Sequence, residues 1–270
     1  MRILHPVLLT LCSLAAISLL PAGVPSKDGA GGGDDELDVF LLAGQSNMAG
    51  RAPVEPFDQL IWPTLFSLDS TNQWVPAKEP LHFDKPSLVG VGPGLTFGRI
   101  VAEAQPSRRV GLVPAAVGGS SITAWAAGAQ HPQTKSHPYD DAVRRAQFAM
   151  KAGRLRAILW IQGESDATAA LAPVYYDQLV ELIARFRRDL HNPKLPFIIG
   201  QRPALLGGRN NAWRETIDTA QRRAAQELPQ VWYVGAPSLV ALPDGLHLDA
   251  PSAREIGRRL AECYLTKAAD

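Results

Sequence analysis

Cysteine is almost absent from this sequence of 270 residues. Of its two cysteines, Cys12 lies in an apolar N-terminal segment and Cys263 lies close to the C-terminus. If the N-terminal segment is removed on secretion, a single cysteine remains, which excludes an intrachain disulfide and a cysteine-based metal cluster. The fold must therefore be stabilised by its hydrophobic core, and a chain of this length can bury one of sufficient size.

Neither sign of charge dominates. The chain has 27 lysine and arginine residues against 26 aspartate and glutamate residues. Loss of an N-terminal signal would remove one base, Arg2, and leave the two numbers equal. A neutral domain lacks the basic surface that favours nucleic acid or an anionic membrane. We therefore expect neither of them as a partner of the mature chain, and the sequence leaves the oligomeric state open.

No apolar run has the length that is typical of a membrane-spanning helix. The apolar stretch 7–20 has roughly 14 residues, against the ~20 that a bilayer requires. It follows Arg2 and precedes small residues, a pattern typical of a secretory signal peptide. We predict a signal peptide over 1–25, cleaved between Ala22 and Ser26, and hence a secreted protein. An uncleaved membrane anchor is the alternative.

The remainder is predicted to form one domain. Residues 26–37 are rich in glycine and predict a flexible linker, and residues 38–267 alternate strand-like runs with helical patterns. Predicted strands cover 38–43, 110–114, 157–161, 196–200 and 231–234. Predicted helices cover 95–104, 139–151, 173–190, 209–228 and 251–267. This alternation, with strands that are apolar on both faces, predicts an α/β fold: a three-layer α/β/α sandwich with a five-stranded parallel sheet.

The segment 51–91 lacks a clear long helix or strand. It contains six prolines together with several aromatic residues. A loop of this length in a compact domain is usually functional. Two interpretations stay open: an excursion over the top of the sheet that shapes a substrate cleft, or an ordered loop that packs its aromatic residues on the flank of the domain.

Ser46 is the first candidate for a catalytic side chain. It lies in the motif GQSNM (44–48), directly after the apolar run 39–43. Glycine at a strand end lets the chain turn sharply and brings the serine to the sheet edge where α/β proteins bind ligands. Because Met48 occupies the second glycine position, the motif lacks the Gly-x-Ser-x-Gly frame of α/β-hydrolases. We interpret Ser46 as a nucleophile; a turn or helix-capping serine is the alternative.

Two further motifs are candidates for stabilising an oxyanion. The paired glycines Gly118 and Gly119 follow the second predicted strand and allow backbone N–H groups to approach a ligand closely. Gln162, in the motif QGESD after the third strand, can donate a side-chain hydrogen bond. The alternatives are a turn at the glycines and a loop or capping role for Gln162. Glu164 and Asp166 could instead form a paired-carboxylate hydrolase site, or simply be solvated.

Asp244 and His247 form a DxxH motif just before the last predicted helix. An imidazole can accept the serine proton and return it to the leaving group, and a carboxylate can hold the ring in the required tautomer. Zinc binding by this pair is the alternative, but no further histidine or aspartate lies at a convincing ligand spacing. We expect no metal and no organic cofactor.

Together the four motifs resemble the ordered blocks of the SGNH/GDSL hydrolase superfamily. They are most similar to its sialate O-acetylesterase-like branch, carbohydrate esterase family 6, over nearly the whole mature chain. The resemblance implies that Ser46 is the nucleophile, His247 the general base and acid, and Asp244 its orienting residue. It implies an oxyanion hole formed by the N–H groups of Ser46 and Gly119 with the Gln162 side chain. It also implies a five-stranded parallel sheet in the order 2-1-3-4-5.

Several other residues are candidates for the cleft. Arg51 directly follows the nucleophile motif and could bind a polar group of the substrate or cap a helix. Four further side chains could line the cleft, with a structural role as the alternative for each: His82, Trp125, His131 and His137. Of these, Trp125 is the candidate for stacking on a sugar ring.

The sequence thus predicts a secreted serine esterase that removes O-acetyl groups from carbohydrates such as acetylated xylan or sialic acid. Two other interpretations stay open: a non-catalytic carbohydrate-binding protein on the same fold, and an esterase for lipid or aryl esters. The complete set of candidate side chains argues against a binding protein, and the chain lacks an obvious long apolar lid, which disfavours a lipase. The identity of the sugar depends on loops such as 51–91.

Overall fold

The computed structural model describes residues 36–201 and 212–268, so the predicted signal peptide (1–25) and the linker up to residue 35 lie outside the described residues. The strands are β1 (Leu37–Gly44), β2 (Leu65–Leu68), β3 (Trp74–Pro76), β4 (Arg109–Pro114), β5 (Gly153–Ile161), β6 (Phe197–Gly200) and β7 (Val231–Val234). The α-helices are α1 (Ser46–Ala49), α2 (Gly94–Ala104), α3 (Pro138–Ala149), α4 (Tyr175–Asp189), α5 (Ala212–Glu227) and α6 (Ala250–Lys267). Residues 209–211 of the predicted fourth helix lie outside the described part of the chain.

The strands form one sheet in the order β3-β2-β4-β1-β5-β6-β7. The five predicted strands are β1, β4, β5, β6 and β7, which are parallel and lie in the predicted order 2-1-3-4-5. The prediction of only five strands was wrong, because the segment 51–91 adds two at one edge. In that segment β2 pairs parallel with β4, and β3 pairs antiparallel with β2. These strands have four and three residues, too few to give a clear alternation of apolar and polar positions.

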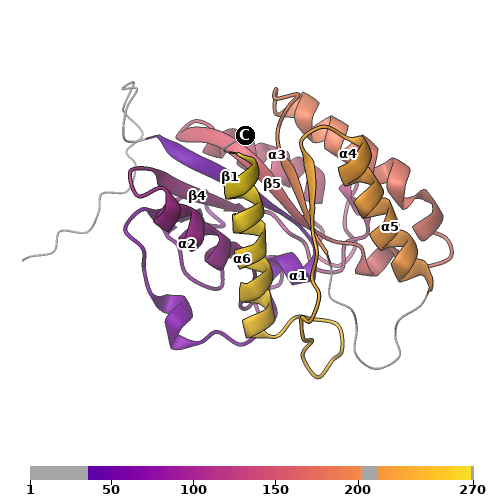
Figure 1. Cartoon of the computed structure of the whole chain (residues 1–270), viewed down its shortest axis with the longest axis horizontal. Coiled ribbons are helices and arrows are strands. Elements are labelled where there is room, and N and C mark those ends of the chain that lie inside the picture. The colour runs from indigo at the N-terminus through magenta and orange to yellow at the C-terminus, as the bar shows by residue number, and fades with distance from the viewer. Residues whose placement is uncertain (1–35, 202–211, 269–270) are drawn as a thin grey trace, which may run out of the picture.

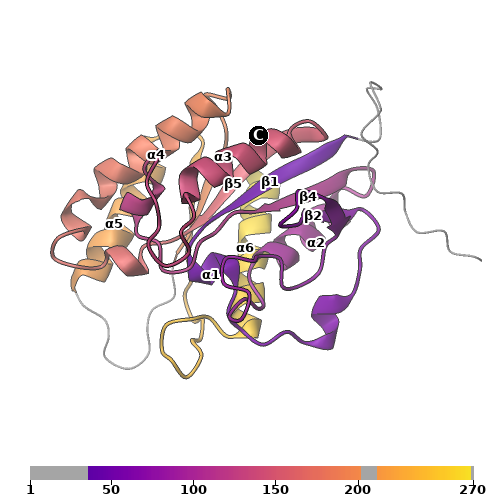
Figure 2. The same cartoon turned by 180° about the vertical axis from the view of Figure 1, so that it is seen from behind.

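The side chains of β1 alternate between two hydrophobic cores, as a buried central strand requires. Phe40 and Leu42 pack with residues of α2 and α6, whereas Val39 and Leu41 pack with residues of α3, α4 and α5. Figure 1 shows α2 and α6 in front of the sheet, and Figure 2 shows α3 and α4 on the opposite face. The predicted three-layer arrangement is therefore confirmed.

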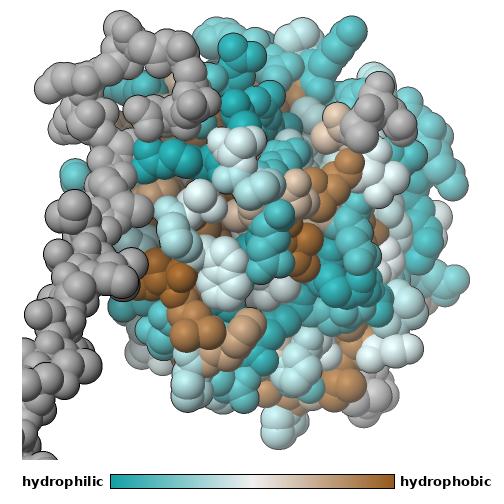
Figure 3. All heavy atoms as spheres, turned by 60° about the vertical axis from the view of Figure 1, so that its left-hand side comes forward, coloured by the Kyte–Doolittle hydropathy of each residue, from teal (hydrophilic) through white to brown (hydrophobic). Residues whose placement is uncertain are grey.

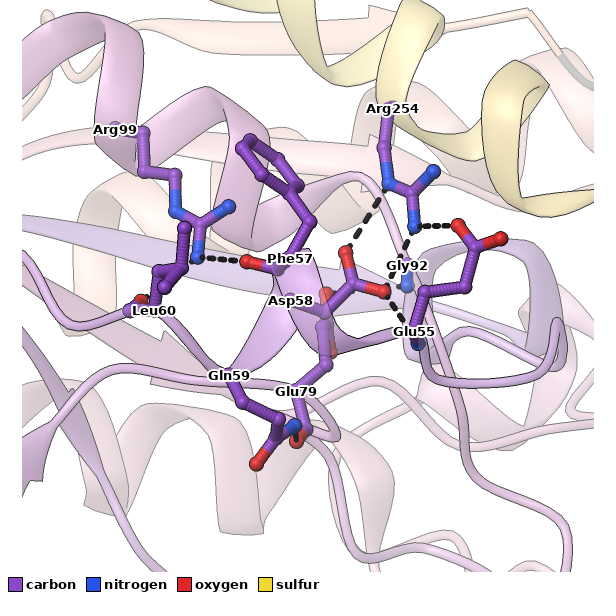
Figure 4. Close-up of polar contacts among 9 residues, drawn as sticks. All are labelled: Glu55, Phe57, Asp58, Gln59, Leu60, Glu79, Gly92, Arg99 and Arg254. Atoms are coloured by element: carbon purple, nitrogen blue, oxygen red, sulfur yellow. Dashed lines mark hydrogen bonds and ion pairs between the residues drawn. The ribbon is translucent and has the colours of Figure 1, made fainter.

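Arginines from two helices anchor the first part of the segment 51–91 (Figure 4). Arg254 of α6 forms ion pairs with Asp58 at 2.7 Å and Glu55 at 2.5 Å. Arg99 of α2 is buried and donates to two backbone carbonyl groups of the segment. These acceptors are the carbonyl groups of Phe57 and Leu60. This part of the segment therefore packs on the flank of the domain.

The later part of the same segment returns to the neighbourhood of α1. The buried carboxyl group of Glu79 accepts the N–H groups of Leu81 at 2.9 Å and Gly92 at 3.2 Å. A Cβ atom at Gly92 would lie only 2.8 Å from the carbonyl oxygen of Met48 in α1, so the two segments are in close contact. The flank interpretation thus describes the first part of the segment 51–91, and a role in shaping a substrate cleft stays a prediction.

Exposed apolar side chains also gather on this segment. They are Val54, Phe57, Leu60, Ile61, Val75, Phe83 and Leu88. Figure 3 brings the side of the molecule with α2 and this segment forward and shows apolar patches set among polar side chains. The segment 51–91 is therefore held against the domain by ion pairs and hydrogen bonds, and it also exposes apolar side chains to solvent.

The helix α6 begins directly after the loop that carries Asp244 and His247. Asp249 caps its first turn by accepting the N–H group of Ser252 at 2.8 Å, and Pro251 occupies a position in that turn where proline is favourable. This cap defines where the loop ends.

Within residues 36–201 and 212–268, no helix combines the length and the apolar character that crossing a membrane requires.

Candidate active site

The strand β1 ends in a sharp turn into the single helical turn α1. Gly44 has a φ of +128°, and a Cβ atom there would lie 2.1 Å from the backbone oxygen of Ile161 in β5. Only glycine fits this turn. Ser46 is the first residue of α1, which lies at the lower end of the sheet in Figure 1, close to the loop that precedes α6.

Three of the predicted site residues meet at this end of the sheet. Ser46 Oγ lies 3.0 Å from His247 Nε2, although the two residues are 201 positions apart in the chain. His247 Nδ1 lies 2.6 Å from Asp244 Oδ2. When the Nδ1 proton is donated to the carboxylate, the lone pair of Nε2 faces the serine hydroxyl. This arrangement can remove the proton of Ser46.

Asp244 is fixed within its own loop. Its Oδ1 accepts the N–H groups of Leu246 at 2.8 Å and His247 at 3.0 Å. Desolvation alone would raise the pKa of Asp244, but the hydrogen bonds from these N–H groups and from the imidazole outweigh it, and the pKa lies below its ordinary value. The carboxylate is therefore ionised at neutral pH and holds the imidazole in one tautomer.

In the described part of the chain, both backbone N–H groups of the predicted oxyanion hole are free to donate. The N–H group of Gly118 is occupied, because it donates to Asp84 Oδ2 at 2.7 Å. Among residues 36–201 and 212–268, the N–H groups of Gly119 and Ser46 have no hydrogen-bond acceptor. Gly119 has a φ of +82°, which glycine adopts without strain. Gly119, rather than Gly118, is thus the glycine with a free donor.

Gln162 is held within the protein. Its buried Nε2 lies 3.1 Å from the carbonyl oxygen of Ser120 and 3.2 Å from Gln45 Oε1, and it also donates to the Asp166 carboxylate. Its Oε1 accepts the hydroxyl group of Tyr175 at 2.9 Å. Both amide hydrogens therefore have acceptors inside the protein, and Gln162 supports the loop after β4 through Ser120. Donation by Gln162 to a substrate oxygen stays a prediction.

The N–H group of Gly118 donates to a carboxylate that is part of a buried ion pair. Asp84 Oδ2, its acceptor, also accepts from Arg51 Nη2 at 2.8 Å, and these two side chains are only 2% and 7% exposed. Arg51 also donates to the carbonyl group of Gly50 at 2.7 Å, which is the C-cap residue of α1. Of the two roles predicted for Arg51, the structure agrees with helix capping. The pair connects the end of α1 with the loop after β4.

Comparison with known proteins assigns the chain to a family. A sequence model of the family described as carbohydrate esterase, sialic acid-specific acetylesterase, matches residues 36–266. The chain belongs to this family. It is therefore a hydrolase that acts on ester bonds, and the resemblance predicted from the four motifs is confirmed.

Individual relatives agree with this assignment. An Arabidopsis thaliana protein named as a probable carbohydrate esterase is 34% identical over 248 residues, which cover 84% of this chain and 90% of the relative. The X-ray structure of that protein gives a TM-score of 0.73 at 33% identity and covers 86% of this chain and 98% of the other. NanS, at 19% identity and a TM-score of 0.68, covers 87% of this chain and 98% of its own and shares the fold. A carbohydrate acetylesterase from Xanthomonas citri shares it too, with a TM-score of 0.66 at 21% identity over 83% of this chain and 55% of that protein.

Three of the four side chains that were candidates for the cleft are buried, so the alternative of a structural role applies to them. Trp125 is 0% exposed and packs edge to face against Trp160, with ring centroids 5.0 Å apart, so it cannot stack on a sugar. His82 and His131 are each 4% exposed. His137 is partly exposed and is the N-cap residue of α3. Residue type alone could not separate these positions from the cleft, because histidine and tryptophan are common both in cores and in binding sites.

Glu164 and Asp166 contact different parts of the esterase. Glu164 Oε1 accepts from Asn47 at 2.6 Å, and the buried Asp166 accepts the N–H group of Ile122 at 3.0 Å. These separate structural contacts argue against a paired-carboxylate site. In the described part of the chain, no group of three histidine, cysteine, aspartate or glutamate side chains is arranged to hold a metal ion.

Two residues of the site were missed by the sequence analysis. Asn47 contacts the backbone on both sides of His247, and Asp84 holds the N–H group of Gly118. The signal for Asn47 was its position directly after Ser46 in a motif already singled out. Asp84 lies in the segment 51–91, where no pattern connects it with the paired glycines.

Burial of His82 is expected to make the stability of the esterase depend on pH. Desolvation lowers the pKa of this histidine, and its Nε2 has no hydrogen-bond partner within the described residues. Near pH 6.5 the unfolded chain binds a proton that the folded chain does not. The free energy of unfolding should therefore fall as the pH decreases below about 6.5, by up to about 1.4 kcal/mol per pH unit. Urea denaturation between pH 7 and pH 5 measures this slope.

His82→Gln should reduce the pH slope, because glutamine does not titrate. His191→Gln is the matched control, since His191 is exposed on the surface. It should keep the slope of the wild-type chain. Equal slopes in all three proteins would show that other groups cause the pH dependence.

Proposed function

We propose that the esterase removes O-acetyl groups from carbohydrates through an acetyl-enzyme on Ser46. The observation that carries the proposal is the hydrogen-bonded row in which His247 lies 3.0 Å from Ser46 Oγ and 2.6 Å from Asp244. The description of the family and the name of the Xanthomonas citri protein support acetyl groups on carbohydrates as the substrate. We also propose that the protein is secreted, on the basis of the signal-like segment 1–25.

The reaction follows from the positions of the three side chains. Ser46 Oγ attacks the acetyl carbon while His247 Nε2 takes the hydroxyl proton, and Asp244 stabilises the resulting imidazolium. The bond from the acetyl carbon to the sugar oxygen then breaks, and this oxygen leaves with the proton from His247. A water molecule attacks the acetyl-enzyme and gives its proton to His247. Acetate leaves as this proton returns to Ser46.

Backbone donors support the charged intermediate. We infer that the N–H groups of Ser46 and Gly119 bind the oxyanion, and loss of one such donor typically costs about 10²–10³ in kcat. Gln162 was predicted as a third donor. It would have to exchange one of its present acceptors, such as Ser120 O, for the substrate oxygen.

The acetylated sugar itself is left open among xylan, sialic acid and other glycans. The exposed apolar surface of the segment 51–91 and the loops around the site would select among them. A lipid or aryl ester is a different substrate class for the same chemistry. A carbohydrate-binding protein without catalysis would have no activated serine, and this difference separates it experimentally.

The proposal predicts release of acetate from at least one member of a panel of acetylated xylan, acetylated sialic acid and other acetylated glycans. It also predicts covalent labelling of the chain by a fluorophosphonate, which requires an activated serine. Mass spectrometry should locate the label on Ser46. Aryl or lipid esters cleaved in place of every acetylated glycan would change the substrate class. Absence of both acetate release and labelling would favour a binding protein.

A further inference from the structure

Asn47 connects the helical turn of Ser46 with the loop of His247. Its Oδ1 accepts the N–H group of Leu248 at 2.9 Å, and its Nδ2 donates to the carbonyl group of Leu246 at 3.2 Å. The side chain is buried between the two segments. The backbone on both sides of His247 is therefore bonded to the residue that follows Ser46.

Glu164 orients this amide. Its Oε1 accepts from Asn47 Nδ2 at 2.6 Å, which is the shortest of the three contacts that Asn47 makes. The second oxygen, Oε2, is buried without a hydrogen-bond partner in the described part of the chain. Both hydrogens and the carbonyl oxygen of the amide are thus engaged, so the amide cannot rotate without losing contacts. The carboxylate also selects one of the two orientations of the amide.

The other hydrogen bonds of this loop do not determine its distance from Ser46. Within the described residues, its backbone hydrogen bonds and the Asp249 cap run to the loop itself or to α6. Asp244 fixes the imidazole relative to the loop only. Leu248 packs in the same apolar core as Met48 and Ala49 of α1. Among the hydrogen bonds of the described residues, those of Asn47 are therefore the ones that connect the backbone of the loop with α1.

We propose that Asn47, oriented by Glu164, is a positioning residue that sets the distance between Ser46 Oγ and His247 Nε2. The proposal rests on the proposed function, because it assigns these two residues to proton transfer. A displacement of about 1 Å at reacting groups can lower a rate about 10²-fold. Loss of the contacts of Asn47 should therefore act on kcat and leave substrate binding largely intact.

Single substitutions test the two halves of the contact, with p-nitrophenyl acetate as the probe. Asn47→Ala removes all three hydrogen bonds and should lower kcat about 100-fold, with KM within about threefold of the wild-type value. The rate of labelling by a fluorophosphonate should fall by a similar factor. Glu164→Gln keeps an oxygen that accepts from Asn47, and its kcat should stay within about fivefold of the wild type.

A double variant reverses the direction of the hydrogen bond. Asn47→Asp keeps the shape of the side chain but places an oxygen against the Glu164 carboxylate, and it should lose as much activity as Asn47→Ala. In the combined Asn47→Asp and Glu164→Gln variant, the new amide can donate to the new carboxylate. Its kcat should exceed that of Asn47→Asp at least about tenfold, because the coupled residues do not act additively. Two residues that act independently of each other predict no such recovery.

Tyr139→Phe is the control for a general loss of stability. It removes one partly buried hydrogen bond, from Tyr139 to Asp189, which does not involve the site, and it should keep the wild-type kcat. The positioning role is overturned if Asn47→Ala keeps kcat within threefold, if its loss appears in KM alone, or if the double variant shows no recovery. Ser46→Ala separates this result from the proposed function. Full activity of Ser46→Ala refutes the proposed function. If Ser46→Ala is inactive but the Asn47 variants keep the wild-type kcat, the positioning role alone is refuted.

Discussion

Ser46→Ala is expected to lower kcat for acetate release by about 10⁴- to 10⁶-fold, the range seen when a catalytic serine is removed from a triad. The alanine variant keeps the backbone donors and the binding surface but has no oxygen that can form an acetyl-enzyme. The fold should be unchanged, because Ser46 Oγ contacts only His247 through a hydrogen bond in the described residues. Acetate release and the thermal unfolding temperature of the two proteins measure both expectations.

His247→Ala provides the matched comparison for this result. It should lower kcat by a similar factor, and the combined Ser46→Ala and His247→Ala variant should lose little more than either single variant, because the two side chains act as one unit. Retention of more than a tenth of the wild-type kcat by Ser46→Ala would contradict the assignment of the nucleophile. Additive losses in the double variant would mean that the two residues act in separate steps.

Most of the parallel strands were predictable because they are long or buried on both faces. β1 and β5 have eight and nine residues, and their apolar runs are flanked by glycine and by helical patterns. β2 and β3 were missed because they are short strands whose existence depends on pairing with β4 and with each other. Such pairing is a property of the tertiary structure and leaves little trace in the local sequence.

The residues of the candidate site likewise include some whose proximity was predictable from the sequence and some whose contacts were not. Asp244 and His247 are close in the chain, and the motifs of Ser46 and Gly119 follow parallel strands whose carboxyl ends meet at one edge, so their proximity was predictable. Asp84 comes from a segment without a recognisable pattern, and its contact with Gly118 spans 34 positions that include α2 and β4. The burial of Trp125 could not be predicted either, since it depends on contact with Trp160 of β5.

Asp84→Ala is expected to lower both the stability and the activity of the esterase. The substitution leaves the Arg51 guanidinium buried without its acidic partner, a change that typically costs about 3–5 kcal/mol in the free energy of unfolding. It also removes the acceptor of the Gly118 N–H group, so the neighbouring N–H group of Gly119 is no longer held in place. We expect a fall in kcat of about 10- to 100-fold, less than complete loss of an oxyanion donor. Urea denaturation and steady-state kinetics measure the two effects.

A second substitution separates the stability effect from the activity effect. In the combined Arg51→Met and Asp84→Ala variant no unpaired charge stays buried, so a large part of the lost free energy of unfolding should return. The activity should stay low, because Gly118 still has no acceptor. If kcat recovers together with stability, the ion pair acts on the site only through the general stability of the fold. If kcat stays low in a stable protein, the carboxylate of Asp84 positions the loop of Gly119 directly.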